Sequence, residues 1–247
     1  MLCASALFWG ASAARAQTYH FAAHGGGSKK DEFLDFAVDA AGNSYLLFKY
    51  EGNVNVAGNA HANPSKNTLL TRFDASGGLA LTKDIVAEWP NFLFGALGVS
   101  DDGVVVTAAR TKAGVLDGHA VYAGNFIGKL GGNGVFEWVL QPVDRVEGAR
   151  LFNEFRVTAI EVVQDAIYVA ATADGRVILN GVSDPGFAID NQQSALLIKM
   201  DLDGNVAWIR HIPTPDVDNH PTIEGGMDHI LPSADGRHVY VAGKVGD

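Results

Sequence analysis

Short apolar runs, each about the length of a β-strand, alternate with polar turns along most of the chain. Many positions in these runs hold β-branched or aromatic residues, which favour strands, and the runs are too short for independent helices. The turns between them are rich in glycine, asparagine and aspartate, the residues that β-hairpins require. No segment shows a sustained helical period, so the pattern predicts an all-β protein with very little helix.

The alternation recurs with a period of roughly 60 to 70 residues, which is typical of repeat architectures. One half of the repeat reads LLTRFDASGGLAL at 69–81, FIGKLGGNGVFEW at 126–138 and LLIKMDLDGNVAW at 196–208. The other half reads FLDFAVDAAGNSYLLF at 33–48, FGALGVSDDGVVVTAA at 94–109, RVTAIEVVQDAIYVAA at 156–171 and MDHILPSADGRHVYVAG at 227–243. Each half supplies two strands and a turn, and four short antiparallel strands per period predict the blades of a β-propeller.

The repeats predict a propeller-like array of about three and a half four-stranded antiparallel blades. The blades are expected near 19–85, 86–140 and 141–212, with a partial blade at 213–247. Within them we expect strands near 33–38, 44–50, 67–74 and 79–85, then 93–99, 103–110, 122–130 and 134–140, then 156–162, 165–172, 194–201 and 205–212. Because propellers contain about four to eight blades, we interpret the chain as a fragment of a longer protein. Residues 18–27 resemble an outer strand that could complete the last blade of a closed ring.

The two middle strands of each blade are joined by a longer connection, at 51–66, 111–121 and 173–193. Because equivalent connections of a propeller emerge on the same face, we expect these variable loops to form one surface on which a ligand could bind. An alternative is that parts of them, such as residues 54–58, extend the hairpin.

Residues 1–16 differ from the rest of the chain and are interpreted as a secretory signal peptide. A short apolar run is followed by Ala14-Arg15-Ala16, a match to the A-x-A cleavage site, which predicts cleavage before Gln17. The usual basic opening is missing, so the signal is atypical or truncated; a buried N-terminal strand or helix is the alternative. The apolar run is shorter than the roughly 18 residues of a membrane span. The prediction is a secreted, periplasmic or cell-surface protein whose mature chain is not inserted in a membrane.

Composition narrows the chemistry of the mature chain. Cys3 is the only cysteine and lies inside the signal segment, so disulfides, thiolate catalysis and cysteine-ligated zinc are excluded for the mature chain. The formal net charge of −10 argues against nucleic acid or an anionic membrane as the main partner, because both require a basic surface. The expected ligand is an unidentified protein or carbohydrate.

The repeat resembles the bacterial β-propeller repeat family of the SBBP type. The resemblance is carried by GGGSKKDEFLDFAVDAAGNSY and ALLIKMDLDGNVAW, which combine a D-x-x-GN turn, an aromatic strand and a G-x-x-x-W spacing. It covers about 19–247 and is weaker in the second blade, where SDDGV lacks the asparagine, while the first blade has Leu81 in place of tryptophan. The resemblance implies an exported or surface protein and no catalytic residues.

Two groups of residues could bind a metal ion. Asp201, Asp203 and Asn205 match the D-x-D-x-N opening of a calcium loop, but the twelfth position holds Ile212. A hairpin turn, in which the aspartate oxygens accept backbone N–H bonds, is the alternative.

The second group, in 211–229, consists of His211, Asp216, Asp218, His220, Glu224, Asp228 and His229. Of these, Asp216, Asp218, His220 and Glu224 are the candidate metal ligands, and solvated loop residues are the alternative. Zinc or calcium would be the metal at the second group, but no cofactor is expected, with calcium as the alternative.

Aromatic and basic residues also recur. Trp138 and Trp208 occupy equivalent positions, which favours packing between blades over sugar stacking. Trp89 interrupts the repeat and precedes a proline, so it is the candidate aromatic contact for a ligand. A further equivalent set is Arg72, Lys129 and Lys199. We expect these to pair with blade carboxylates or extend to an edge; a ring of cations lining a channel is the alternative.

The function that the sequence predicts is binding or scaffolding. No G-x-S-x-G or HExxH motif occurs, and the glycines at 25–27 open no helical pattern, so the sequence indicates no nucleophile, zinc protease or phosphate loop. The alternative is a propeller hydrolase or lyase with site residues in the connections or in missing blades. Against it, the connections at 51–66 and 111–121 offer only Glu51 and Asp117 as carboxylates. A surface module repeated for length is a third reading.

Overall fold

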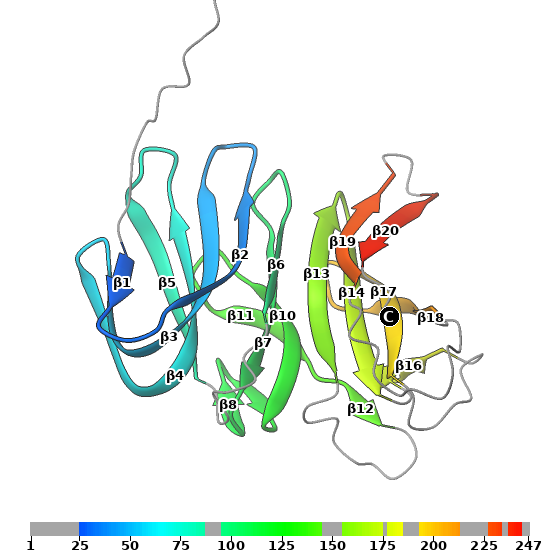
Figure 1. Ribbon diagram of the computed structural model, residues 1–247. Helices are drawn as coiled ribbons and strands as arrows, with labels where there is room; N and C mark the ends of the chain where they lie inside the picture. The colour runs from blue at the N-terminus through cyan, green and yellow to red at the C-terminus, as the bar shows by residue number, and fades with distance from the viewer. Residues whose placement is uncertain are drawn as a thin grey trace, which may run out of the picture.

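The computed structural model describes residues 25–86, 95–144, 155–174, 177–184, 193–212, 227–233 and 237–243. Within these ranges the chain forms strands and turns and contains no helix (Figure 1), which confirms the all-β prediction. No helix in this part of the chain is long and apolar enough to cross a membrane. The signal segment 1–16 lies outside the described residues.

The first sheet contains four strands in chain order and one short additional strand. Its strands are β1 (Gly25–Gly27), β2 (Glu32–Val38), β3 (Ser44–Val56), β4 (Asn59–Phe73) and β5 (Leu79–Val86). Strands β2 to β5 form an antiparallel meander, and β1 pairs with the far end of β3. The meander is the arrangement that four successive hairpin-forming runs predict.

Two further sheets and a hairpin repeat this meander. The second sheet contains β6 (Ala96–Val99), β7 (Val105–Thr111), β10 (Gly124–Leu130) and β11 (Phe136–Leu140). The third contains β13 (Arg156–Val163), β14 (Ala166–Asp174), β17 (Gln193–Asp201) and β18 (Val206–Ile212). The hairpin is β19 (Met227–Pro232) and β20 (Val239–Gly243). All pairs are antiparallel, so the expected four-stranded sheets are present.

The repeat in the sequence is also a repeat in strand register. On the third strand of each sheet, the basic residue lies opposite an apolar or aromatic residue of the second strand, in the pairs Arg72–Tyr45, Lys129–Val106 and Lys199–Tyr168. A β-bulge follows each basic residue in its pairing with the fourth strand. Equivalent positions in the three sheets can therefore be compared residue by residue.

Consecutive sheets pack face to face, in the order of the chain (Figure 1). The innermost strands are neighbours, because β6 contacts β2 on one side and β13 on the other, and β13 contacts β19. We call the face that each sheet turns to the following sheet its forward face, and the opposite face its back face. The forward face of one sheet and the back face of the next enclose one apolar cluster at each contact.

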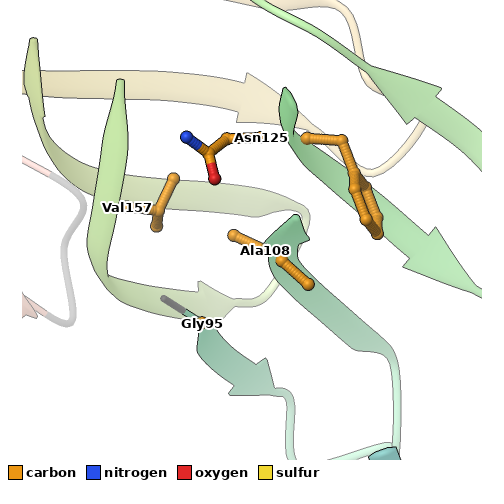
Figure 2. Close-up of a pocket in the computed structure, with 6 residues that line it drawn as sticks. Gly95, Ala108, Asn125 and Val157 are labelled. Carbon is orange, nitrogen blue, oxygen red and sulfur yellow. The ribbon is translucent and has the colours of Figure 1, made fainter. Parts of the chain in front are cut away.

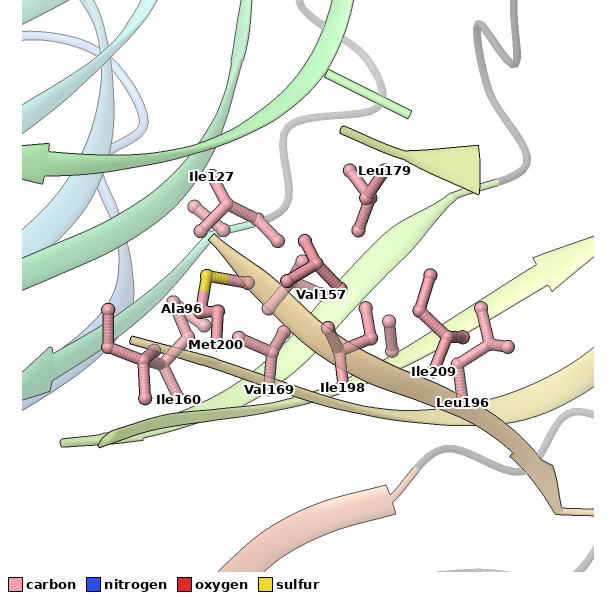
Figure 3. Packing of buried hydrophobic residues seen from close by; sticks show 14 of the residues in the cluster. Ala96, Ile127, Val157, Ile160, Val169, Leu179, Leu196, Ile198, Met200 and Ile209 are labelled. Atoms are coloured by element: carbon pink, nitrogen blue, oxygen red, sulfur yellow. The ribbon is translucent and has the colours of Figure 1, made fainter. Parts of the chain in front are cut away.

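The largest cluster lies between the second and third sheets. Figure 3 shows Ala96 and Ile127 of the second sheet against Ile160, Val169 and Ile198 of the third. These side chains are almost completely buried. Burying a side chain of this size contributes about 1.5–3 kcal/mol, so this contact is a main source of stability.

The connections between middle strands differ from the expected variable loops. Residues 54–58 belong to a continued hairpin, as the alternative proposed, because β3 runs to Val56 and β4 starts at Asn59. The second connection contains β8 (Gly114–Leu116) and β9 (His119–Val121). The third contains β15 (Val177–Leu179) and β16 (Val182–Ser183), with β12 (Val143–Asp144) paired to β15. All three leave their sheets at the same end; the first then curves back over the back face of its own sheet, where Val54 and Val56 pack with Leu69 and Phe73 (Figure 1).

A shared turn explains why these connections form hairpins. The two turn residues of each have positive φ: Ala57 (48°) and Gly58 (87°), Asp117 (49°) and Gly118 (89°), Asn180 (47°) and Gly181 (78°). Positive φ at both positions defines the type I′ turn, whose twist matches that of paired strands. We call the paired segments 52–62, 114–121 and 177–183 the first, second and third connection hairpins.

Candidate functional site

Each connection hairpin contacts the outermost strand of its own sheet. In the first, His61 of the hairpin lies beside Asp84 of β5, with 2.9 Å between Nδ1 and Oδ2. Tyr50 of β3 donates to the other carboxylate oxygen at 2.5 Å, and the Asn67 amide donates to the Tyr50 hydroxyl at 3.4 Å. Burial and the hydrogen bond to Asp84 raise the pKa of Tyr50 to about 12, so its hydroxyl remains a donor at neutral pH.

Two polar atoms of this network lack a hydrogen-bond partner among the described residues. They are Nε2 of His61 and Oδ1 of Asn67, and both are buried. A buried polar group without a partner costs about 1–3 kcal/mol, so such atoms often indicate a constraint other than stability. The Tyr50–Asp84–His61 network is therefore the part of this end of the sheet with the most potential for chemistry.

The second connection hairpin is held by Asp117. Its Oδ2 atom accepts the backbone N–H of Phe136 on β11 at 2.9 Å and also binds Lys83 of β5 in the first sheet. Nε2 of His119 lies 3.0 Å from the carbonyl oxygen of Phe136. Burial acts to raise the pKa of Asp117, but the hydrogen bonds from Lys83 and Phe136 outweigh it and hold the pKa below its usual value. The carboxylate thus ties the hairpin to two sheets.

The third connection hairpin ends on Asp184, which contacts the outermost strand in the same way. Its Oδ2 atom accepts the backbone N–H of His211 on β18 at 2.8 Å and lies 3.3 Å from the Nδ1 atom of that ring. Both side chains are largely buried. A carboxylate bound to the N–H of an outermost strand blocks strand addition there, which is one way to manage an exposed sheet edge.

A second polar region lies where the innermost strands meet. The Asp35 carboxylate of β2 accepts the N–H of Leu97 on β6 at 2.8 Å. Burial raises the pKa of Asp35, although the hydrogen bonds from Leu97 and Phe36 and the charge of His229 oppose the rise. Burial also raises the pKa of Glu161 on β13, and the negative charge of Asp35 adds to it. These two carboxyl groups retain protons more readily than exposed ones.

A hollow between the second and third sheets is too small for a ligand site. Gly95, Ala108, Asn125 and Val157 line it (Figure 2). Its empty space, open solvent included, is only about 170 Å³, whereas ligand pockets enclose roughly 300–1,000 Å³. At its rim, the backbone at Gly95 approaches Leu47 so closely that a Cβ atom would lie 2.7 Å from the leucine methyl. The hollow is a packing gap.

The candidate ligand and metal residues fall outside the described part of the chain. These are Trp89, Asp216, Asp218, His220 and Glu224. His229 is described and exposed on β19. Among the described residues, no group of three or more histidine, cysteine, aspartate or glutamate side chains is placed to hold a metal ion.

The D-x-D-x-N segment forms the hairpin turn that was the alternative to a calcium loop. Oδ1 of Asp201 accepts the backbone N–H of Asp203 at 3.0 Å and that of Asn205 at 2.8 Å. Oδ2 accepts the side-chain amide of Asn205 at 2.9 Å. These hydrogen bonds, first that from the Asn205 side chain, lower the pKa of Asp201. Both carboxylate oxygens are engaged within the turn.

The recurring aromatic and basic residues pack between strands and sheets. Trp138 donates from Nε1 to the carbonyl oxygen of Leu202 at 2.9 Å and lies under Gly204 of the next sheet, where a Cβ would come within 3.0 Å of its ring. Lys129 pairs with Glu137 at 2.9 Å, as expected for a blade carboxylate. Lys199 instead lies over the ring of Tyr168, 5.3 Å from its centroid.

Sequence reasoning missed most residues of the connection end. The Asp-Gly and Asn-Gly pairs at 117–118 and 180–181 were available as hairpin signals. The partners of Asp84 could not be found in this way, because His61 is 23 residues away and the contact depends on how the hairpin folds back.

Neither a protein-family model nor a curated protein sequence matches the chain.

Proposed function

We propose that the protein is an exported repeat module of the β-propeller type that acts in binding or scaffolding. The observation that carries the proposal is that a connection hairpin leaves the same end of each of three consecutive sheets, and that the second and third hairpins project from that end. The positions that recur most regularly hold core side chains and turn residues. The hairpin tips, whose residues differ between repeats, therefore provide the variable surface. The partner would be a protein or a carbohydrate that contacts the second and third hairpins.

The β-propeller arrangement is supported by the packing of the innermost strands. Strands β2, β6, β13 and β19 are neighbours in that order, as the inner strands of successive blades would be. The described residues include three sheets that each contain a four-stranded meander, and one further hairpin, which supports an array of about three and a half blades. The resemblance to the SBBP-type repeats and the signal-like segment 1–16 support export.

Binding is tested with one substitution at each end of the sheets. Val115 is 74% exposed at the tip end of the second connection hairpin, and Ala75 is exposed in the β4–β5 turn at the opposite end. The chain from Gln17 is screened against a glycan array and a phage-displayed peptide library. We expect a binder from one screen, weakened about tenfold or more by Val115→Arg and unchanged by Ala75→Arg.

The result that would overturn the proposal is equal loss in the two variants, or no binder in either screen. Export is tested separately by expressing the complete chain in a bacterial host and sequencing the N-terminus of the protein in the periplasm or medium. We expect the mature protein to begin at Gln17, and retention of residues 1–16 on a cytoplasmic protein would contradict export.

A further inference from the structure

The three connection hairpins share a hydrogen-bonding pattern that leaves one residue of the first strand facing outward. The two residues that flank a two-residue turn bond to each other, as the i and i+3 positions of a β-turn do. Pairs in an antiparallel ladder alternate, so the residue one step before turns its N–H and C=O away from the partner strand. That residue is Asn55 in the first hairpin, Val115 in the second and Ile178 in the third.

Two of these three outward positions carry a third strand. Asn55 pairs with Gly26 of β1, and Ile178 pairs with Val143 of β12. Both added strands are antiparallel, and they are only three and two residues long. This edge of a connection hairpin therefore accepts a short extended segment.

The edge of β8 is the open equivalent. Within the described ranges, β8 pairs with β9 and with no other strand. Val115 is 74% exposed, and a Cβ atom added to Gly114 would meet nothing beyond its own chain neighbours within 4 Å. By contrast, Asp117 and Asp184 each occupy an N–H of an outermost strand, on β11 and β18. The outward backbone groups of Val115 are thus accessible to an added strand.

We propose that the β8 edge binds an extended segment of a partner protein, which joins the hairpin as an antiparallel third strand. This inference rests on the proposed binding function and narrows its partner to a polypeptide, because an extended chain presents N–H and C=O groups at the spacing of the edge. The pairs Asn55–Gly26 and Ile178–Val143 favour a single extended segment over the hairpin edge of a second copy.

The third hairpin also indicates which side chain suits the position opposite Val115. There, the β-branched Val143 lies opposite the β-branched Ile178. β-Branched side chains pack well against their cross-strand neighbours, so the partner segment should place valine or isoleucine opposite Val115.

The probe is the capped peptide QPVDRV, which copies residues 141–146 and so contains the sequence of β12. It is titrated to about 5 mM into the ¹⁵N-labelled chain from Gln17 and followed by NMR. We expect saturable shifts of the Val115 amide, with a dissociation constant on the order of 1 mM, because few backbone hydrogen bonds form. Hydrogen exchange at Val115 should be fast in the free protein and slower with the peptide.

Proline substitution separates strand addition from side-chain contact. Val115→Pro removes the outward N–H at a position where an edge strand tolerates proline, so affinity for the peptide should fall at least about tenfold. Ala75→Pro is the matched control, since Ala75 holds the second position of the β4–β5 turn, which favours proline, and it should bind as the unchanged protein does. Circular dichroism and thermal melting check that both variants fold.

A second measurement leaves the protein unchanged. An N-methyl group on the first valine of the peptide removes the N–H that would bond to the Val115 carbonyl. This peptide should also bind at least about tenfold more weakly.

Absence of saturable binding, or binding that survives Val115→Pro or the N-methyl group, would overturn the proposal. A Val115 amide protected from exchange without peptide would overturn it too, since the edge would already be filled. Self-association of the peptide-free chain that Val115→Pro abolishes would identify a second copy as the occupant instead. A library or glycan binder weakened by Val115→Arg but not by Val115→Pro would overturn strand addition and leave the proposed binding function in place.

Discussion

The contact between the first and second sheets differs in chemistry from the contact between the second and third. The latter is a mainly aliphatic cluster and is bridged by neutral hydrogen bonds, from Trp138 to the Leu202 carbonyl and from Asn125 to the Phe155 carbonyl. The former contains aromatic residues and is bridged by two carboxylates, since Asp35 accepts the Leu97 N–H and Asp117 binds Lys83. One repeat can thus build a contact that depends little on pH or one that depends on it, according to which side chains occupy equivalent positions.

The largest expected loss of stability comes from removing apolar volume from the aliphatic contact between the second and third sheets. Ile198 is completely buried within it. Ile198→Ala should lower the free energy of unfolding by about 2–5 kcal/mol, because a cavity adds to the lost burial. Chemical denaturation measures the change. Phe36→Ala, at an exposed position, is the control at a concentration where the chain is monomeric, and an equal loss there would contradict the assigned burial.

A smaller effect is expected from the carboxylate that bridges the first and second sheets. Asp117→Asn keeps an acceptor for the Phe136 N–H but removes the charge beside Lys83, whose side chain is only 14% exposed. The free energy of unfolding should fall by about 1–2 kcal/mol at neutral pH. Because the folded pKa of Asp117 is lowered, its contribution is present above the ordinary value of 3.8 and disappears as pH falls through the folded pKa.

The difference between Asp117→Asn and the unchanged chain should therefore shrink in acid. Denaturation curves at several pH values measure it, and Lys83→Met gives the matched removal of the other partner. A difference that persists at pH values below the folded pKa would show that the charge of Asp117 is not the cause.

The corresponding polar bridge of the aliphatic contact should be weaker and independent of pH. Trp138→Phe removes the Nε1 hydrogen bond to Leu202 while keeping an aromatic ring under Gly204. We expect a loss of about 0.5–1.5 kcal/mol, the usual net value of one hydrogen bond. The same denaturation series should show a constant loss across pH, and a pH-dependent loss would contradict the contrast between the two contacts.

Asp35 provides a second test of the contact between the first and second sheets, because its contribution to stability changes with pH in the opposite direction to that of Asp117. Its pKa is raised, so the folded state takes up a proton more readily than the unfolded state, and stability rises as pH falls through the folded pKa towards 3.8. Asp35→Asn should abolish this rise. It should also lower the pKa of Glu161, since the Asp35 charge contributes to raising it. NMR titration of the Glu161 carboxyl measures this, and an unchanged titration would contradict coupling between β2 and β13.

The smallest effect concerns calcium at the turn that adjoins Trp138. Both oxygens of Asp201 already accept hydrogen bonds within the turn, so a cation would have to displace them. We expect calcium, zinc or a chelator to change the melting temperature by less than about 1 °C. Asp201→Ala is the control, since it removes the turn interactions themselves. A shift with calcium that this substitution abolishes would instead identify the turn as a metal site.

The sequence predicted the strands of the four-stranded meanders and their pairing because both depend on local information. Alternation of apolar residues and glycine-containing turns specified these hairpins, with D-x-x-G-N turns at Asp39–Asn43 and Asp201–Asn205. The faces that contact one another could not be predicted, because a bulge such as that between Phe33 and Asp35 reverses which side chains point to the next sheet. The raised pKa of Glu161 could not be predicted either, because its neighbour Asp35 lies on a strand far away in the sequence.

The type I′ turns of the connection hairpins give the protein separable display positions. Each hairpin leaves one middle strand and returns on its neighbour. Asp117 of the second turn also holds two sheets together, but the third turn is exposed at Asn180 and Gly181. A peptide inserted between Asn180 and Gly181 would begin and end at the same two points in space. The residues displayed at that turn can therefore change without altering the apolar contacts between the sheets, which makes the array a suitable scaffold for grafting foreign epitopes.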